Sequence, residues 1–139
     1  MSKPGWSAAT AAFIIAMPAL AQTGIPDLRG TWKGQSESVI LGGNPHHPEI
    51  QSKEPRFTSV AFTLTIDKQE GRRFHGTFAS ARSSETVVAV ISRTGAIYMA
   101  DDDGSAFGAV LAPDRIELCY LHRSANSRIA SCTEFLKQP

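Results

Sequence analysis

The sequence has no excess of either charge: 14 of its 139 residues are Lys or Arg and 13 are Asp or Glu. Basic surfaces are what bind nucleic acids and anionic membranes, so this balance argues against both kinds of partner. After Ala21 there is no apolar run long enough to cross a bilayer, which argues against a membrane span in that part. Cysteine is scarce as well, and Cys119 and Cys132 can form at most one intramolecular disulfide.

The first 21 residues have the three parts of a signal peptide. Lys3 supplies the positive charge, an apolar run reaches from Ala8 to Met17, and Ala19 and Ala21 form the cleavage signature. Cleavage removes one of the 14 basic residues, leaving 13 against 13 acidic, and no cysteine follows that would carry a lipid anchor. We therefore expect a secreted or periplasmic protein with a signal peptide at 1–21, a linker at 22–29 and a single domain at 30–139.

Both cysteines lie in the part expected to be exported, where oxidising conditions let disulfides form. Neither has a histidine or a second cysteine at zinc-finger spacing, so no metal is expected there. If strands 115–122 and 127–136 join through Ser124 to Ser127, Cys119 faces Cys132 across the hairpin. Cβ atoms of directly opposed residues lie about 4.5–5.5 Å apart, which suits a disulfide. The sequence therefore predicts a Cys119–Cys132 disulfide.

The same register sets Glu117 opposite Glu134, and like charges in that position need solvent. We therefore expect the disulfide on the outer face of the hairpin. The inner face is then formed by Ile116, Leu118, Tyr120, Ile129, Ser131, Thr133 and Phe135.

No part of the chain after the signal peptide has the period of an amphipathic helix, whereas short alternating segments recur between turn residues. The expected strands are 30–41, 57–67, one through Phe74, Gly76 and Phe78, 83–93, 96–100, 106–111, 115–122 and 127–136. They predict an all-β, eight-stranded antiparallel up-and-down barrel, with a two-sheet sandwich as the alternative. Closure is favoured because it removes exposed sheet edges.

Two strands have clear faces. Trp32 and Ile40 share the inward face of the first strand, whose middle is small and polar. On the second, the inward set is Val60, Phe62, Leu64 and Ile66. Gln69-Glu70-Gly71 suits a three-residue hairpin loop, which sets Ile66 opposite Phe74.

Gly30-Thr31-Trp32 opens the first strand, and this Gly-x-Trp start resembles that of the calycins, the lipocalins and avidins. The resemblance implies that Trp32 closes the barrel floor. Avidins bind the biotin head group with an asparagine two residues after this tryptophan and a serine six after it. Gly34 and Ser38 occupy these positions here, and Trp32 is the only tryptophan after the signal peptide. Biotin is therefore not the expected ligand.

The loop from Gly42 to Arg56 contains three prolines and has no periodicity; it resembles the first loop of lipocalins, which lies across the open end of the barrel. Loops of this length are often functional, so His46 and His47 are candidate loop residues. Together with Glu49 they have the chemistry of a zinc or copper site, but the favoured interpretation is an exposed loop without metal. The acidic run 101–103 before Gly104 lacks the ligand spacing of an EF-hand and is interpreted as a turn.

The candidate binding site is a polar strip on the inner wall. In a closed barrel the last strand returns beside the first, so hydroxyls of both strands cluster there. Buried hydroxyls need partners, so the strip indicates mutual hydrogen bonds, water or a ligand. The candidate ligand-binding residues are Trp32, Ser36, Ser38, Tyr120, Ser131 and Thr133.

We expect an exported binding protein that holds a small ligand in a partly polar interior and needs no cofactor. The alternative is an interaction module, such as an enzyme inhibitor, that acts through the loop from Gly42 to Arg56. Catalysis is not expected, because Gly34–Ser38 lacks the last glycine and the following helix of a nucleophile elbow. His75 and His122 have no spacing that pairs either with a nucleophile.

Overall fold

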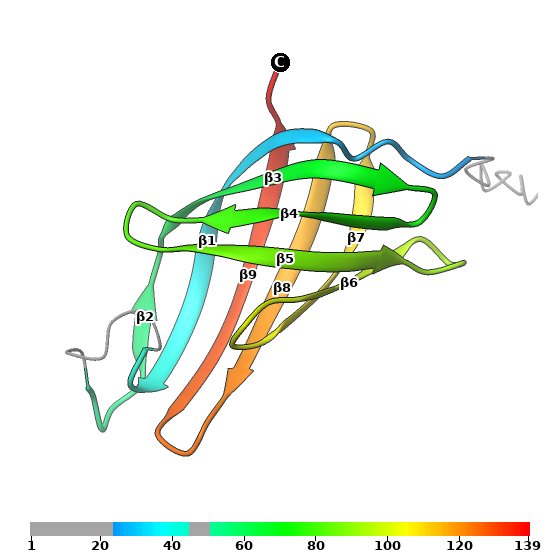
Figure 1. The fold of residues 1–139 in the computed structure, drawn as a ribbon. Coiled ribbons are helices and arrows are strands. Elements are labelled where there is room, and N and C mark those ends of the chain that lie inside the picture. The colour runs from blue at the N-terminus through cyan, green and yellow to red at the C-terminus, as the bar shows by residue number, and fades with distance from the viewer. Residues whose placement is uncertain (1–23, 45–50) are drawn as a thin grey trace, which may run out of the picture.

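The computed structural model describes residues 24–44 and 51–139. The predicted signal peptide at 1–21 and the loop residues His46 and His47 lie outside the described residues. The strands are β1 (Gly30–Gly42), β2 (Arg56–Thr58), β3 (Ala61–Glu70), β4 (Arg73–Ala79), β5 (Ser84–Ile91), β6 (Ala96–Ala100), β7 (Ser105–Ala112), β8 (Arg115–Arg123) and β9 (Ser127–Lys137). Each pairs antiparallel with its neighbours, and β1 also pairs with β9, which closes the sheet (Figure 1). The predicted up-and-down barrel is therefore confirmed.

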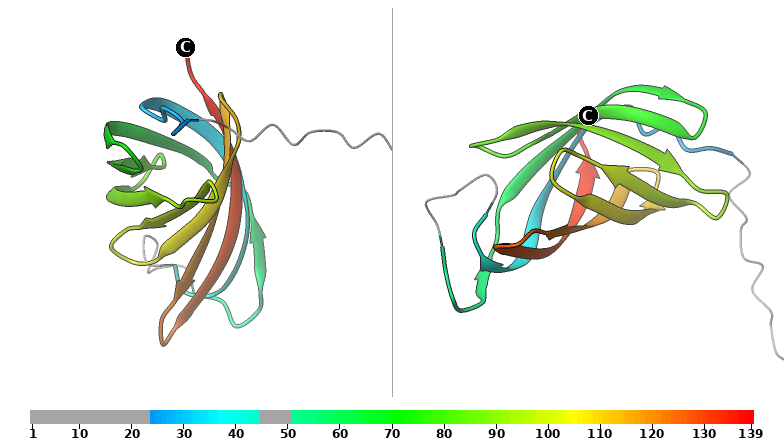
Figure 2. Two further views of the ribbon diagram at one scale, coloured as in Figure 1. Left: turned by 90° about the vertical axis from the view of Figure 1, so that its right-hand side faces the viewer. Right: turned by 60° about the horizontal axis from the view of Figure 1, so that its bottom comes forward.

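Nine strands fill eight positions of this barrel. β2 and β3 both pair with β1 in one continuous register, Ser38 with Thr58 and Gln35 with Ala61, so together they form one interrupted strand. In Figure 1, β3, β4 and β5 cross the direction of β1, β8 and β9, and Figure 2 shows the same strands from the side and from below. Closure leaves no open edge along β1, because both of its sides carry partners.

The long first strand has the faces expected from its alternation. Trp32, Ser36 and Ile40 are buried inside the barrel, whereas Lys33 and Glu37 are exposed. The strand pairs with β9 from Trp32 to Gly42, so the two ends of the domain hold each other. Glycine lets the strands approach closely here, since a Cβ on Gly34 would lie 2.3 Å from the Glu134 carbonyl oxygen.

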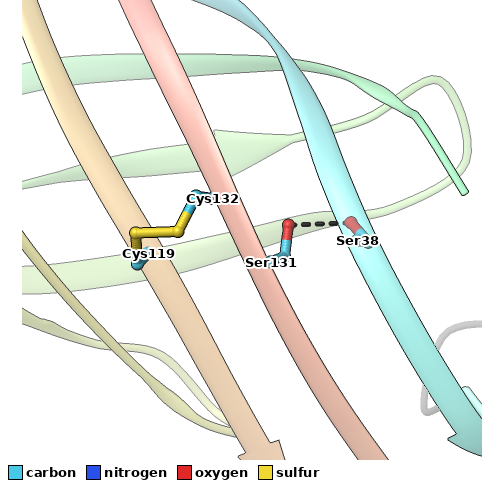
Figure 3. Close-up of a disulfide and its surroundings, with 4 residues drawn as sticks. All are labelled: Ser38, Cys119, Ser131 and Cys132. Atoms are coloured by element: carbon cyan, nitrogen blue, oxygen red, sulfur yellow. Dashed lines mark hydrogen bonds between the residues drawn. A yellow bond between two sulfur atoms is a disulfide. The ribbon is translucent and has the colours of Figure 1, made fainter. Parts of the chain in front are cut away.

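The last hairpin has the predicted register. Cys119 faces Cys132, Glu117 faces Glu134, and Arg123 faces Arg128. The disulfide is present (Figure 3). It lies on the outer face of the barrel wall, since Cys132 is exposed and the neighbouring Thr133 is buried. Ile116, Leu118 and Phe135 are buried on the opposite face, as expected.

The register predicted for the β3–β4 hairpin is wrong. Ile66 faces Gly76 and not Phe74, which instead faces Gln69. The cause is a bulge at Asp67, between Ile66 and Lys68, followed by a tight turn that begins at Gly71 with φ 57°. The extra residue shifts the pairing, yet Ile66 and Phe74 both remain buried inside the barrel.

The inward face predicted for the second strand is correct for Leu64 and Ile66, which are buried. Near the start of the predicted strand, the side chains are more exposed. Val60 is 40% exposed, because the strand is interrupted between β2 and β3. Phe57, before the interruption, is 86% exposed. The same interruption places Val60 at the wall of a cavity described below.

The segment before β1 closes one end of the barrel. Leu28 and Trp32 are both fully buried, and the indole Nε1 donates to the Leu28 carbonyl oxygen at 2.8 Å. Gln69 clamps the segment: its Oε1 accepts from the Leu28 N–H at 2.8 Å and its Nε2 donates to the Pro26 carbonyl at 2.7 Å. The residues expected to be a linker thus contribute Leu28 to the core.

Candidate functional site

A cavity of about 100 Å³ lies at the end of the barrel opposite to Trp32. One water needs on the order of 10–15 Å³ by this measure, so the cavity accommodates several water-sized groups. Its wall comes from the far ends of the strands and is formed by Ser38, Ile40, Asn44, Thr58, Val60, Phe62, Phe78, Ser83, Glu85, Met99, Asp101, Ala106, Leu118, Tyr120, Ile129, Ser131, Thr133 and Phe135.

Aromatic rings form the deep wall of this cavity. Phe62 and Phe78 stack with their centroids 4.6 Å apart, and Phe135 meets Phe78 edge to face at 6.0 Å. Their positions follow from strand alternation, since these side chains point inward from β3, β4 and β9. The cavity therefore offers apolar surface to a ligand.

Three serines of the predicted polar strip, Ser36, Ser38 and Ser131, bond one another through their hydroxyls. Ser38 on β1 donates to Ser131 Oγ on β9 at 2.8 Å (Figure 3). The Ser38 hydroxyl also lies 3.2 Å from Ser36 Oγ. Ser38 and Ser131 face each other in the β1–β9 register, which explains the contact. Mutual bonding satisfies these groups without any ligand.

Ser36 maintains the interrupted strand. Its hydroxyl accepts from the Val60 N–H at 3.0 Å, and its carbonyl oxygen accepts from the Ser59 hydroxyl at 2.7 Å. Side chains thus provide hydrogen bonds where the ladder between β1 and the β2–β3 segment is irregular. Ser36 is fully buried and does not line the cavity.

The structure separates the predicted site residues into two groups. Ser38, Tyr120, Ser131 and Thr133 line the cavity. Trp32 and Ser36 do not: the first closes the other end of the barrel, and the second holds the strand interruption. Whether the four wall residues bind a ligand stays a prediction.

Tyr120 occupies a position shaped by the turn between β6 and β7. Its ring lies so close to Gly104 that a Cβ on that glycine would be 2.6 Å from the Tyr120 ring and hydroxyl. Partial burial raises the pKa of the Tyr120 hydroxyl, and the negative charges of Asp101, Glu85 and Asp103 raise it further. Like any tyrosine, it is protonated at neutral pH and can donate a hydrogen bond, and the raised pKa extends this to alkaline pH.

Sequence reasoning missed five polar residues of the wall, namely Asn44, Thr58, Ser83, Glu85 and Asp101. Thr58 Oγ1 is buried without a hydrogen-bond partner among the described residues. Asp101 was assigned to a turn, and it does hold one, since its Oδ1 accepts from the N–H groups of Asp103 at 3.1 Å and Gly104 at 2.6 Å. Glu85 lies near the start of β5, a strand whose faces the evenly apolar sequence left unassigned.

No cluster of three or more metal-ligating side chains occurs within residues 24–44 and 51–139. The same described ranges contain no helix long and apolar enough to span a bilayer.

No family model matches the chain, and no curated protein matches it in sequence. Solved structures of similar fold include the following two. A redesigned β-barrel is 8% identical with a TM-score of 0.46, covering 81% of this chain and 92% of its own. An S-type phycobiliprotein lyase from Guillardia theta is 13% identical with a TM-score of 0.40, covering 81% of this chain and 89% of its own. Such low identities concern the fold alone and say nothing about a ligand.

Proposed function

We propose that this chain is an exported β-barrel binding protein that holds a small, mainly apolar ligand in the cavity at the open end. The cavity of about 100 Å³ carries the proposal. Its aromatic wall would bury the apolar part of a ligand, and a few polar groups would fix its orientation, as in most small-molecule sites. The small volume favours a ligand, or a ligand segment, that is narrow or flexible.

Two polar groups on the wall favour a cavity that binds a ligand over an interior that side chains fill. Thr58 Oγ1 is buried at the cavity without a partner in the described part of the chain, and an unmet hydroxyl gains a hydrogen bond when a ligand or water arrives. The Tyr120 hydroxyl, which is protonated at neutral pH, offers a donor on the same wall. Ser38 and Ser131 already bond each other and would contribute mainly shape.

We further propose that the protein binds without catalysis and without a cofactor. The titratable groups on the described cavity wall are Glu85, Asp101 and Tyr120. A raised pKa makes the Tyr120 phenolate a scarce species at neutral pH, which disfavours Tyr120 as a nucleophile.

Export to the periplasm or outside the cell is part of the proposal. It is supported by the signal-peptide pattern of residues 1–21 and by the disulfide, since disulfides persist in oxidising compartments. Kinship with the calycins is the finer hypothesis, supported by the Gly-x-Trp start and by the position of Trp32 at the closed end of the barrel.

The test is binding of a neutral, polarity-sensitive naphthylamine dye, measured by fluorescence on the mature protein. Ala106 is buried on the cavity wall, so Ala106→Phe should fill the cavity and abolish the dye signal. The matched control is Ala100→Phe, which places the same ring on the outer face of β6 and should leave binding intact. Circular dichroism checks that both variants keep the barrel.

A native mass spectrum of protein purified from its exporting host adds an independent measurement. A small molecule lost on denaturation would identify the ligand by its mass. Dye binding that survives Ala106→Phe but disappears in Ala100→Phe would place the site on the outer surface and contradict the proposal.

A second candidate function is an interaction module, and one observation favours it. Phe57 is 86% exposed on β2, beside the loop from Gly42 to Arg56, and Val39 faces it across the strand pair with 37% exposure. Exposed aromatic side chains often anchor protein contacts. If the dye does not bind and the native mass equals that of the protein alone, the interaction module becomes the favoured function.

A further inference from the structure

We infer that the ligand carries a positively charged amine, held at the cavity wall by the carboxylates of Glu85 and Asp101. This inference rests on the proposed binding function and specifies the chemical class of its ligand. The ligand would place an apolar body against the phenylalanines and its ammonium group between the two acidic side chains.

The charged side chains on the wall all have one sign. Glu85 and Asp101 line the cavity, whereas no Lys, Arg or His of the described residues does. Both acidic residues are partly buried, so water screens their charges less than it would at an open surface. Over the mature chain the charges balance, so this local excess of negative charge is a property of the site.

Asp101 is held rigidly in place. Its Oδ1 accepts two backbone N–H groups of the β6–β7 turn, from Asp103 and Gly104, which orients the carboxylate. Both of these bonds reach Oδ1, so Oδ2 is suited to accept a hydrogen bond from a ligand. A carboxylate fixed in advance loses little side-chain entropy when it binds a cation.

The field of these carboxylates reaches the interior of the cavity. After burial, the negative charges of Asp101 and Glu85 are among the causes that raise the pKa of Tyr120, whose ring lies on the same wall. A field that disfavours the phenolate disfavours any other anion beside it and favours a cation.

The aromatic wall adds to this preference. The ring faces of Phe62, Phe78 and Phe135 carry partial negative charge, which attracts cations within about 6 Å of a ring centroid. Aromatic faces combined with carboxylates are a common arrangement for binding ammonium groups. Fatty acids, by contrast, would bring a carboxylate toward two like charges.

Three probes of equal length and different charge test the inference: octylamine, octanol and octanoate, each competing with the neutral dye at neutral pH. We expect protonated octylamine to compete about tenfold better than octanol, since one charge-assisted hydrogen bond suffices for that ratio. Octanoate should compete least. Raising the ionic strength should weaken the competition by octylamine and leave the competition by octanol unchanged.

The double variant Glu85→Gln, Asp101→Asn keeps the side-chain shapes and should remove the advantage of octylamine over octanol. The matched control is the double variant Asp102→Asn, Glu117→Gln, which removes the same amount of charge from exposed positions. The advantage of octylamine over octanol should persist in this control. The ratio between the two ligands in one protein is unaffected by partial loss of fold. If the double variant fails to fold, the salt dependence in the unchanged protein decides.

The outcomes separate the two proposals. Equal competition by octylamine and octanol, or stronger competition by octanoate, would overturn the amine inference and leave the binding function standing. Failure of the dye and of all three probes to bind would count against both. A tenfold preference for octylamine that survives in the double variant would place the cation elsewhere and overturn the assignment to Glu85 and Asp101.

Discussion

Tyr120 shows how much a single residue depends on its surroundings. In the sequence it is one of two tyrosines on alternating strands, and its parity alone predicts that it points inward. The fold adds Gly104 against its ring and Asp101 and Glu85 nearby, which together with burial raise its pKa. The result is a protonated hydroxyl on a cavity wall of negative charge.

The raised pKa of Tyr120 predicts a loss of stability at alkaline pH. Below about pH 10 the folded and unfolded states both keep the phenolic proton, so the pKa shift costs nothing there. Above that pH the unfolded chain releases the proton and the folded chain retains it, so the free energy of unfolding falls as pH rises. Tyr120→Phe should remove the contribution of Tyr120 to this decrease in the free energy of unfolding. Urea unfolding at several pH values measures it.

The ultraviolet absorbance of phenolate gives a direct control. In Tyr98→Phe, Tyr120 is the remaining tyrosine, and its titration should occur above the ordinary tyrosine range. Titration at the ordinary value, or an unchanged pH slope in Tyr120→Phe, would contradict the assigned environment.

At the level of the element, the β8–β9 hairpin is where sequence and structure agree most fully. Ser124 to Ser127 fixes the turn, the turn fixes the register, and the register places Cys119 opposite Cys132. A local pattern suffices because the strands are adjacent in sequence. The β3–β4 hairpin fails the same reasoning, since a bulge at Asp67 is invisible to alternation and shifts the pairing.

Removing the disulfide should lower stability without changing the fold. The double variant Cys119→Ser, Cys132→Ser opens a loop with a sequence separation of 13 residues, and such a loop contributes about 2–3 kcal/mol through the unfolded chain. Urea unfolding should show this loss, while circular dichroism remains that of a barrel because the ladder on both sides persists.

Reduction of the unchanged protein provides the matched comparison. Dithiothreitol should lower its unfolding midpoint to that of the double variant and have no effect on the variant itself. Equal midpoints with and without reductant would show that the disulfide does not stabilise the barrel.

Over the whole molecule, the two ends of the barrel have different tasks. One end is closed by Leu28 and Trp32, which are joined by the hydrogen bond from the indole Nε1 to the Leu28 carbonyl. Gln69 fixes Leu28 from β3, and Lys137 Nζ lies 5.3 Å from the indole centroid. The other end holds the cavity, where the interrupted β2–β3 strand brings Thr58 and Val60 to the wall.

Leu28→Ala should test the importance of the closed floor. The side chain is fully buried, and removing it leaves a hole in the core, which costs about 2–4 kcal/mol of unfolding free energy. Ile25→Ala is the matched control, because Ile25 lies in the same segment but is 47% exposed and should cost less than about 1 kcal/mol. Similar losses in both variants would contradict the role of Leu28 as a plug.

The sequence by itself determined the barrel, its inward face on β1, the last hairpin and the disulfide. Alternation has a period of two and tight turns join neighbours, so these features are set by residues close together in the chain. It also indicated four residues of the cavity wall, Ser38, Tyr120, Ser131 and Thr133, because closure brings the last strand beside the first.

Only the tertiary structure decided which end of the barrel is open and what surrounds the cavity. Leu28 enters the core from a segment that reads as a linker, and Ser36 bonds the backbone of a strand 24 residues away. Glu85 meets the cavity from a strand whose pattern does not assign its faces, and Asp101 meets it from the β6–β7 turn. These contacts join residues distant in sequence, and their geometry exists only once the sheet has twisted and closed.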